Sequence, residues 1–299
     1  MTPAPDRRGA AASEQTGPNQ EPTTEQKTEQ ADLQQQQETL AMRHENHPAY
    51  VAERLQLEQR GFIGKSDQIA RQIVAWQQLA PDEKQHTVPV KKWEKNIIAE
   101  DGRVEIISNW ASFDVLQYQD KPASAGMSMI HLLAIPRNYI FNGVDLDEES
   151  VDILDDMISL FEVSWKDPAI RLKILDSQRE AINRRAEATK GQPFTNEAHQ
   201  VALDHYAWLE STINDLDAGD FCYGLHLHPD NSADYLHLHI IAAPYEFRKY
   251  STSKHDKKTK DAIEVRDFIK RAAQDQRATM PRTPSISDEA SKRSPVAAT

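Results

Sequence analysis

The stretch "GLHLHPDNSADYLHLHII", residues 224–241, contains four histidines arranged as two His-Leu-His pairs. The whole chain of 299 residues has only 11 histidines, so this is a local concentration. Because side chains alternate between the two faces of a β-strand, each pair is expected to project from a single strand face. The polar connection between the pairs, which begins with Pro229, predicts a turn and therefore an antiparallel hairpin.

A turn near Ser232 would place His228 opposite His237 and His226 opposite His239. Directly opposed residues of an antiparallel pair share a face, with Cβ atoms about 4.5–5.5 Å apart. All four imidazoles would then line one wall, while the intervening leucines would face a core. Imidazoles titrate near neutral pH and need partners when buried, so four in alternation indicate a functional site rather than strand filler.

Two kinds of site fit such a cluster. A metal ion could take imidazole ligands and keep an open position for a substrate. Alternatively, one imidazole could act as a nucleophile while its neighbours hold it in the correct tautomer. The single cysteine, Cys222, excludes a disulfide framework and a cysteine-based zinc site.

The two ends of the chain differ in composition from its middle. Residues 1–44 have few aliphatic side chains and many Gln, Glu, Thr and Pro residues, so they cannot bury enough surface to offset their ordering entropy. We expect them to be disordered, and residues 277–299 likewise. The folded domain is therefore expected over residues 46–275.

Composition also bounds the partners and the location. The net charge of −12 argues against a nucleic-acid partner, since such binding needs clustered Lys and Arg. The basic run "KHDKKTK", residues 254–260, is predicted to be a solvated loop. No apolar run reaches the roughly 18 residues of a membrane span. We therefore expect no membrane partner and a cytoplasmic or nuclear protein.

Helical and strand patterns alternate along the middle of the chain. Helices are predicted in an N-terminal segment over 46–90, from Asp145 with Glu148 as a capping box, in a helical insertion over 166–216, and at 260–273. Strands are predicted on both sides of a turn at Asp101 and Gly102, and over 113–119, 129–137 and the histidine hairpin. This order predicts an α+β fold with a mainly antiparallel sheet.

Three segments resemble one known family. "YLHLHIIAAP", residues 235–244, is similar to the His-φ-His-φ-His-φ-φ signature of the histidine triad (HIT) proteins, where φ is apolar. "MIHLLAIPRNYI", residues 129–140, resembles the strand and turn that precede a helix in that family. "FCYGLHLHPDNSADY", residues 221–235, resembles the strand and loop that lead into the triad. The matching segments cover roughly residues 93–165 and 217–245.

The resemblance implies a fold and a chemistry. The fold is an antiparallel sheet of about five strands with helices on one side, in a chain that is usually a homodimer. The enzymes of this family hydrolyse or transfer nucleotides, so the expected partner is a nucleotide-like or other small phosphate-containing molecule. By the same resemblance, His237 is the nucleophile that attacks an α-phosphate and His239 is the third triad residue. No metal cofactor is then required for attack.

The chain departs from the family pattern at two positions. Tyr235 occupies the first triad position, and Tyr139 stands where the family often has another histidine. A phenol stays neutral near pH 7 and shuttles protons less readily than an imidazole. His226 and His228, on the flanking strand, are expected to supply basic groups in their place.

Further binding residues follow from the resemblance. Ser232 stands three positions before Tyr235, where the family often has a serine. Asp120 is the candidate for the acidic ribose-binding residue, and Arg137 is a candidate phosphate ligand. His131, inside the apolar strand, is expected to be structural.

The departures leave two alternatives open. One is a repurposed or metal-dependent enzyme that uses His226, His228, His237 and His239 on a non-nucleotide substrate. The other is a non-catalytic nucleotide-binding protein, in which tyrosines stand in place of the family's histidines and the catalytic activity is lost.

Overall fold

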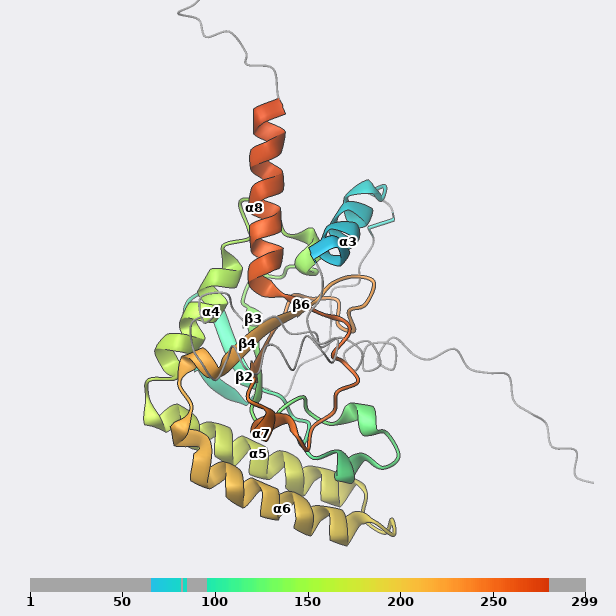
Figure 1. Cartoon of the computed structure of the whole chain (residues 1–299), viewed down its shortest axis with the longest axis vertical. Coiled ribbons are helices and arrows are strands. Elements are labelled where there is room, and N and C mark those ends of the chain that lie inside the picture. The colour runs from blue at the N-terminus through green and yellow to red at the C-terminus, as the bar shows by residue number, and fades with distance from the viewer. Residues whose placement is uncertain (1–65, 82, 85–95, 280–299) are drawn as a thin grey trace, which may run out of the picture.

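The computed structural model describes residues 66–81, 83–84 and 96–279 (Figure 1). Within these residues the fold is α+β, with an open antiparallel sheet of six strands. The α-helices are α3 (Ser66–Gln78), α4 (Ile153–Ser164), α5 (Pro168–Ala188), α6 (Thr195–Thr212), α7 (Tyr245–Arg248) and α8 (Ala262–Thr279). Predictions for residues 1–65 and 280–299 lie outside the described part of the chain.

The sheet has the strand order β1-β2-β3-β5-β4-β6, with every neighbouring pair antiparallel. The strands are β1 (Ile97–Glu100), β2 (Val104–Ser108), β3 (His131–Pro136), β4 (Phe221–His226), β5 (Leu238–Ala242) and β6 (Thr259–Asp261). β3 and β5 lie at its centre, so the strand that carries His239 is flanked on both sides by other strands.

The first hairpin forms where the sequence predicts it, around Asp101 and Gly102. The Asp101 carboxylate accepts hydrogen bonds from the backbone N–H groups of Arg103 (2.7 Å) and Val104 (2.8 Å). This Asx turn satisfies two backbone donors and reverses the chain between β1 and β2.

One face of the sheet carries the main hydrophobic core. Alternate strand residues such as Ile106, Leu132, Leu225 and Leu238 point into it. Helices α4 and α8 pack against this face, and the predicted stripe of Ile69, Ile73 and Trp76 on α3 is buried in the same core. The opposite face carries the histidines.

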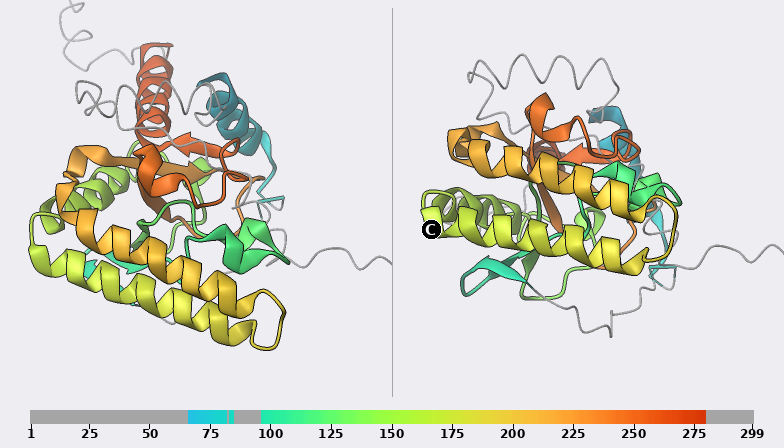
Figure 2. Two further views of the ribbon diagram at one scale, coloured as in Figure 1. Left: turned by 60° about the horizontal axis from the view of Figure 1, so that its bottom comes forward. Right: turned by 90° about the horizontal axis from the view of Figure 1, so that it is seen from below.

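The two helices predicted over residues 166–216 form as α5 and α6. The two helices lie side by side as an antiparallel pair at the end of the molecule away from α8 (Figure 2). Asp167 begins α5 by accepting a hydrogen bond from the Ala169 N–H (2.9 Å), with Pro168 at the first helical position. The loop between them contains Gly191 with a φ of 89°, a conformation that glycine adopts without steric cost.

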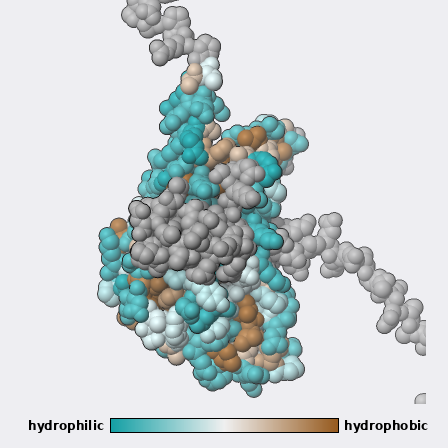
Figure 3. All heavy atoms as spheres, in the orientation of Figure 1, coloured by the Kyte–Doolittle hydropathy of each residue, from teal (hydrophilic) through white to brown (hydrophobic). Residues whose placement is uncertain are grey.

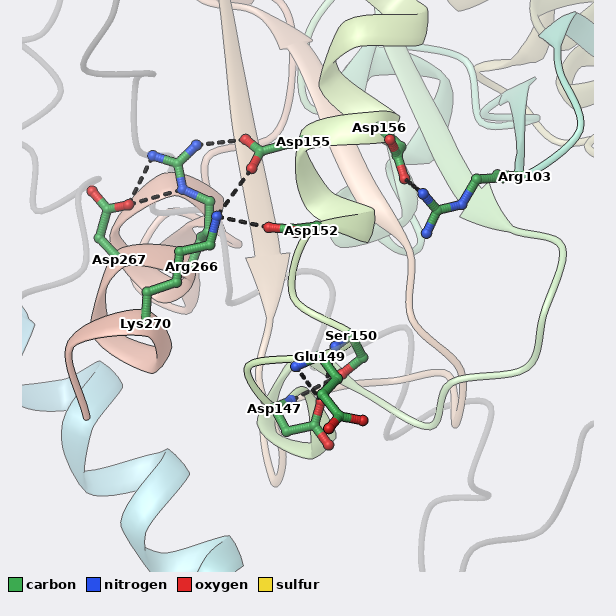
Figure 4. A network of polar contacts seen from close by, with 10 residues as sticks. All are labelled: Arg103, Asp147, Glu149, Ser150, Asp152, Asp155, Asp156, Arg266, Asp267 and Lys270. Atoms are coloured by element: carbon green, nitrogen blue, oxygen red, sulfur yellow. Dashed lines mark hydrogen bonds and ion pairs between the residues drawn. The ribbon is translucent and has the colours of Figure 1, made fainter. Parts of the chain in front are cut away.

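Ion pairs link α8 to α4. Arg266 contacts Asp155 (2.5 Å) and Asp267 (2.7 Å), and Lys270 contacts Asp152 (2.7 Å), as Figure 4 shows. The outer surface of α8 is largely hydrophilic on the face shown in Figure 3. Pairs as exposed as these contribute little individually, so the apolar contacts below them hold α8 in place.

Two predicted elements differ in the structure. Residues 113–119 form no strand: the Asp114 carboxylate accepts the Leu116 N–H (2.9 Å) and starts a short 3₁₀ helix over Val115–Tyr118. The helix predicted from Asp145 begins instead at Ile153. Asp147 accepts the backbone N–H groups of Glu149 and Ser150, and these bonds hold the chain in a turn before the helix.

The C-terminal part of the domain also departs from expectation. Residues 254–260 are not a solvated loop, because His255, Asp256 and Thr259 are buried and Lys260 is only 2% exposed. Thr259 to Asp261 form β6, a strand that the sequence pattern did not predict. Helix α8 continues to Thr279, so the folded region extends past the predicted boundary at residue 275. No helix in the described residues is long and apolar enough to cross a membrane.

Candidate functional site

The histidine hairpin forms, but its register differs from the prediction by two residues. Gly224 pairs with His239 and Leu225 with Leu238. Continuing this ladder by one residue sets His226 opposite His237 rather than opposite His239. The shift arises because the connection over 227–237 is longer than a tight turn. A shift of two residues preserves the face, so His226, His237 and His239 still point to the same side of the sheet.

These three histidines converge. One ring nitrogen from each of them lies within 4.8 Å of the corresponding nitrogen of the other two. His239 Nε2 and His226 Nδ1 are 3.2 Å apart, and the rings of His237 and His239 are 4.8 Å apart between centroids. All three side chains are buried. The sequence therefore predicted correctly that these three side chains face one side of the sheet, although not their pairing.

His228 does not join them. It lies beyond the end of β4, and its ring packs against Trp76 of α3 at 5.1 Å and against Phe141 at 5.9 Å. Its backbone N–H donates to Asn142 Oδ1 (3.0 Å), which turns the chain away from the sheet. Burial lowers the pKa of His228, and Asn231 opposes that effect. The predicted wall of four imidazoles is therefore wrong at this position.

Two other histidines take part instead. His131 of β3, which the sequence indicated only as structural, has its Nε2 2.9 Å from His239 Nδ1. His255, from the segment predicted to be solvated, is 4% exposed and stacks on His226 at 6.3 Å between ring centroids. Neither lies in the His-Leu-His motif. The pairing of β3 with β5 brings His131 beside it, and the segment that leads into β6, which pairs with β4, carries His255. His131 stands in an apolar run with Leu132 and Leu133, and this pattern does not distinguish a site histidine from a core residue.

The hydrogen bonds of the cluster extend across four strands. Asn109 Nδ2 lies 2.8 Å from His131 Nδ1, and His226 Nε2 lies 3.3 Å from Thr259 Oγ1 of β6. Together with the two histidine–histidine contacts, they form a continuous chain from Asn109 to Thr259. We call it the imidazole chain; its rings are those of His131, His239 and His226.

Burial lowers the pKa of two imidazoles of the cluster, His226 and His255. The pKa of His226 is well below its usual value, first because of burial and then because His237 and Lys258 are nearby. Burial likewise holds the pKa of His255 well below its usual value, with His226 and His239 as further causes. Neutral imidazoles retain a lone pair, so these groups can accept a proton or bind a metal ion at neutral pH.

His237 has a defined tautomer. Its Nδ1 lies 3.0 Å from the backbone oxygen of Tyr235. A carbonyl oxygen only accepts hydrogen bonds, so Nδ1 carries a proton, and in the neutral ring Nε2 then carries the lone pair.

A cavity of about 160 Å³ adjoins the cluster. It is bordered by His131, His239, His255 and Asn109 together with small and apolar side chains. His255 Nε2 donates to the Ala123 carbonyl (3.3 Å), whereas its Nδ1 has no hydrogen-bond partner among the described residues. A larger cavity of about 320 Å³ lies between α3 and α8, but no histidine borders it.

Tyr235 lies beside His237, whereas Ser232 is placed only by its burial in the connection between β4 and β5. Tyr235 is buried against Ile107 and Ile135, and its ring is 5.7 Å from that of His237. Ser232 is buried in the connection over 227–237, and its Oγ has no hydrogen-bond partner among the described residues.

The other three predicted binding residues lie elsewhere. Tyr139 is 42% exposed and donates its hydroxyl to the Asp234 carbonyl (2.8 Å); burial and then Asp234 raise its pKa. Arg137 pairs with Glu100 (2.5 Å) and Glu105 (3.0 Å). The Asp120 carboxylate pairs with Arg185 of α5. Arg137 and Asp120 are thus engaged in ion pairs, and none of the three contacts the histidines.

No family model matches this chain, and no similar protein is found among the curated proteins or the solved structures.

Proposed function

We propose that this protein is a phosphate-cleaving hydrolase or nucleotidyltransferase of the histidine triad type, with His237 as its nucleophile. The observation that carries the proposal is the contact between His237 Nδ1 and the Tyr235 carbonyl. In the neutral ring this contact leaves the Nε2 lone pair available, beside the buried rings of His226 and His239. A neutral imidazole is a competent nucleophile near pH 7.

The reaction has two balanced steps. His237 Nε2 attacks the α-phosphorus, an N–P bond forms, and the P–O bond to the leaving group breaks with its electron pair. The leaving oxygen takes a proton from the site or from water. The oxygen of water or of another acceptor then attacks the phosphoramidate, a new P–O bond forms, and the N–P electron pair returns to Nε2. The attacking group releases its proton to the site or to water, which replaces the proton taken by the leaving oxygen.

The resemblance of residues 235–244 to the triad signature adds support, since that segment contains strand β5 at the centre of an open antiparallel sheet. Small nucleotides or other phosphate esters are the proposed substrates. The α5–α6 insertion lies outside the segments that resemble the family.

Replacement of the nucleophile tests the proposal. His237→Ala should reduce turnover on a panel of nucleotides and phosphoramidates by several orders of magnitude, because the covalent path is lost. His199→Gln, on α6 and away from the cluster, is the matched control. A phosphoramidate trapped on His237 in the wild-type protein would support the mechanism. Unchanged turnover of His237→Ala would contradict it.

A second candidate is a metal-dependent hydrolase. Zn–N bonds of about 2.0–2.1 Å in a tetrahedral site put two ligand nitrogens about 3.3 Å apart. The separation of 3.2 Å between His239 Nε2 and His226 Nδ1 matches this value. His226, His237 and His239 would hold the ion and leave one position for water or substrate. Chelator-sensitive turnover, with metal recovered in the purified protein, would favour this candidate over the first.

A further inference from the structure

The direction of the hydrogen bonds in the imidazole chain depends on one residue outside the triad motif. Asn109 follows β2 and holds its side-chain amide between two partners. Its Oδ1 accepts the backbone N–H of Ala111 (3.3 Å), which fixes the orientation of the amide. Its Nδ2 therefore faces His131 Nδ1, at 2.8 Å. An amide NH₂ only donates, so His131 Nδ1 must be an acceptor.

The remaining tautomers follow from that first bond. With Nδ1 unprotonated, the neutral ring of His131 carries its proton on Nε2 and donates to His239 Nδ1 (2.9 Å). His239 then carries its proton on Nε2 and donates to His226 Nδ1 (3.2 Å). His226 in turn donates from Nε2 to Thr259 Oγ1 (3.3 Å). All the bonds of the chain point the same way, from Asn109 to Thr259.

This polarity decides what the triad offers to a ligand. Of the three nitrogens that converge, His237 Nε2 and His226 Nδ1 carry lone pairs, whereas His239 Nε2 carries a proton. A metal ion needs an unprotonated nitrogen from each ligand. For a metal ion to bind at this triad, the proton of His239 must lie on Nδ1. The His239 Nδ1–H would then donate a hydrogen bond to His131 Nε2, which would have to be unprotonated. The proton of His131 would move to Nδ1 and face the NH₂ of Asn109, which accepts nothing.

We infer that Asn109 is a positioning residue that sets the polarity of the imidazole chain and so disfavours a metal ion at His226, His237 and His239. The inference goes beyond the proposed function, because it concerns tautomers and metal affinity and requires no turnover. The same polarity fits the proposed function, in which the buried cluster acts through a histidine nucleophile rather than through a metal ion.

Asn109→Asp tests the inference with almost no change in size. A carboxylate accepts from both the Ala111 N–H and a His131 Nδ1–H, so the polarity should reverse along the whole chain. His131, His239 and His226 would become Nδ1–H tautomers. His239 Nε2 would then expose a lone pair, with its Nδ1–H bound to His131 in the arrangement typical of a metal-ligating histidine. Asn138→Asp, at an exposed position, adds the same charge away from the cluster and is the matched control.

The tautomers are read from two-bond ¹H–¹⁵N correlation spectra of the full chain at pH 8, where the rings are neutral. Resonances are assigned with single His→Gln variants. The wild-type protein and Asn138→Asp should show Nε2–H for all three rings, and Asn109→Asp should show Nδ1–H. Zn²⁺ and Co²⁺ titrations should give about tenfold tighter binding to Asn109→Asp than to either reference, the scale of outer-shell effects on metal affinity.

Either measurement can overturn the inference. Nδ1–H tautomers in the wild-type rings would do so without any substitution, which covers the case of a variant that does not fold. So would a folded Asn109→Asp protein in which His239 keeps its Nε2–H, or in which metal affinity is unchanged. Failure of the proposed function is distinct, since it appears as unchanged turnover in His237→Ala.

Discussion

At the scale of single residues, identical side chains acquire different chemistry from their hydrogen-bond partners. His237 donates from Nδ1 to the Tyr235 carbonyl, and its Nε2 lone pair is available for attack. The centroid of the His239 ring lies 4.8 Å from that of His237. Because the hydrogen bonds of the imidazole chain run from Asn109 to Thr259, His239 presents an N–H at Nε2 instead. The backbone and Asn109, rather than the His-Leu-His motif itself, make this distinction, because a neutral imidazole can place its proton on either nitrogen.

Tyr235 shows how packing limits the restoration of a triad. Its ring is buried with Ile107 and Ile135, so Tyr235→His would remove apolar contacts and place a polar ring among them. We expect Tyr235→His to lower the free energy of unfolding by roughly 1–3 kcal/mol, and Tyr235→Phe to change it much less. Urea unfolding at pH 8 measures both, with the wild-type m-value as a check. Equal stability of the two variants would mean that apolar packing does not determine this position.

At the scale of elements, β6 and the start of α8 position one end of the imidazole chain. Thr259 is the first residue of β6, and Asp261 is its last residue and directly precedes α8. The Asp261 carboxylate accepts the N–H groups of Ile263 (2.6 Å) and Glu264 (3.2 Å). A strand of three residues shows no alternation that a sequence pattern could reveal, which is why these residues were predicted to be a loop and a continuous helix.

Loss of this cap should be measurable. Asp261→Ala leaves two backbone donors of α8 without their acceptor, and we expect a loss of about 1–2 kcal/mol in the free energy of unfolding. Asp261→Asn keeps a side-chain oxygen and should retain most of the stability. Asp275→Ala, exposed near the other end of α8, is the control and should have little effect. Amide exchange in the first turn of α8 should accelerate in Asp261→Ala alone; uniform exchange across the three variants would contradict the capping role.

At the scale of the whole molecule, periodic elements were predictable and long-range neighbours were not. The β1–β2 turn, the strand β3, the α5–α6 insertion and the stripe of α3 follow from local patterns. The convergence of His226, His237 and His239 also followed, because strand alternation preserves a face even when the register shifts by two residues. His131 and His255 could not be found in this way, because their approach depends on strand order and on a buried segment that reads as polar. Asp120 and Arg137 were predicted to bind substrate, but in the structure each is held in an ion pair. Asp120 pairs with Arg185, and Arg137 pairs with Glu100 and Glu105.

The buried cluster makes the stability of the whole domain depend on pH. His226 and His255 have pKa values well below the ordinary 6.5 in the folded state, so they stay neutral there while they protonate in the unfolded chain. The unfolded state therefore binds more protons as the pH falls below about 6.5, and stability is lost in that direction. Above that pH these two groups add no pH dependence to the free energy of unfolding, and below it each lowers that free energy by up to about 1.4 kcal/mol per pH unit. Urea unfolding from pH 8 to pH 5 measures the slope. His255→Asn should make it shallower. A free energy of unfolding that stays constant down to pH 5 would show that neither imidazole is kept neutral by the fold.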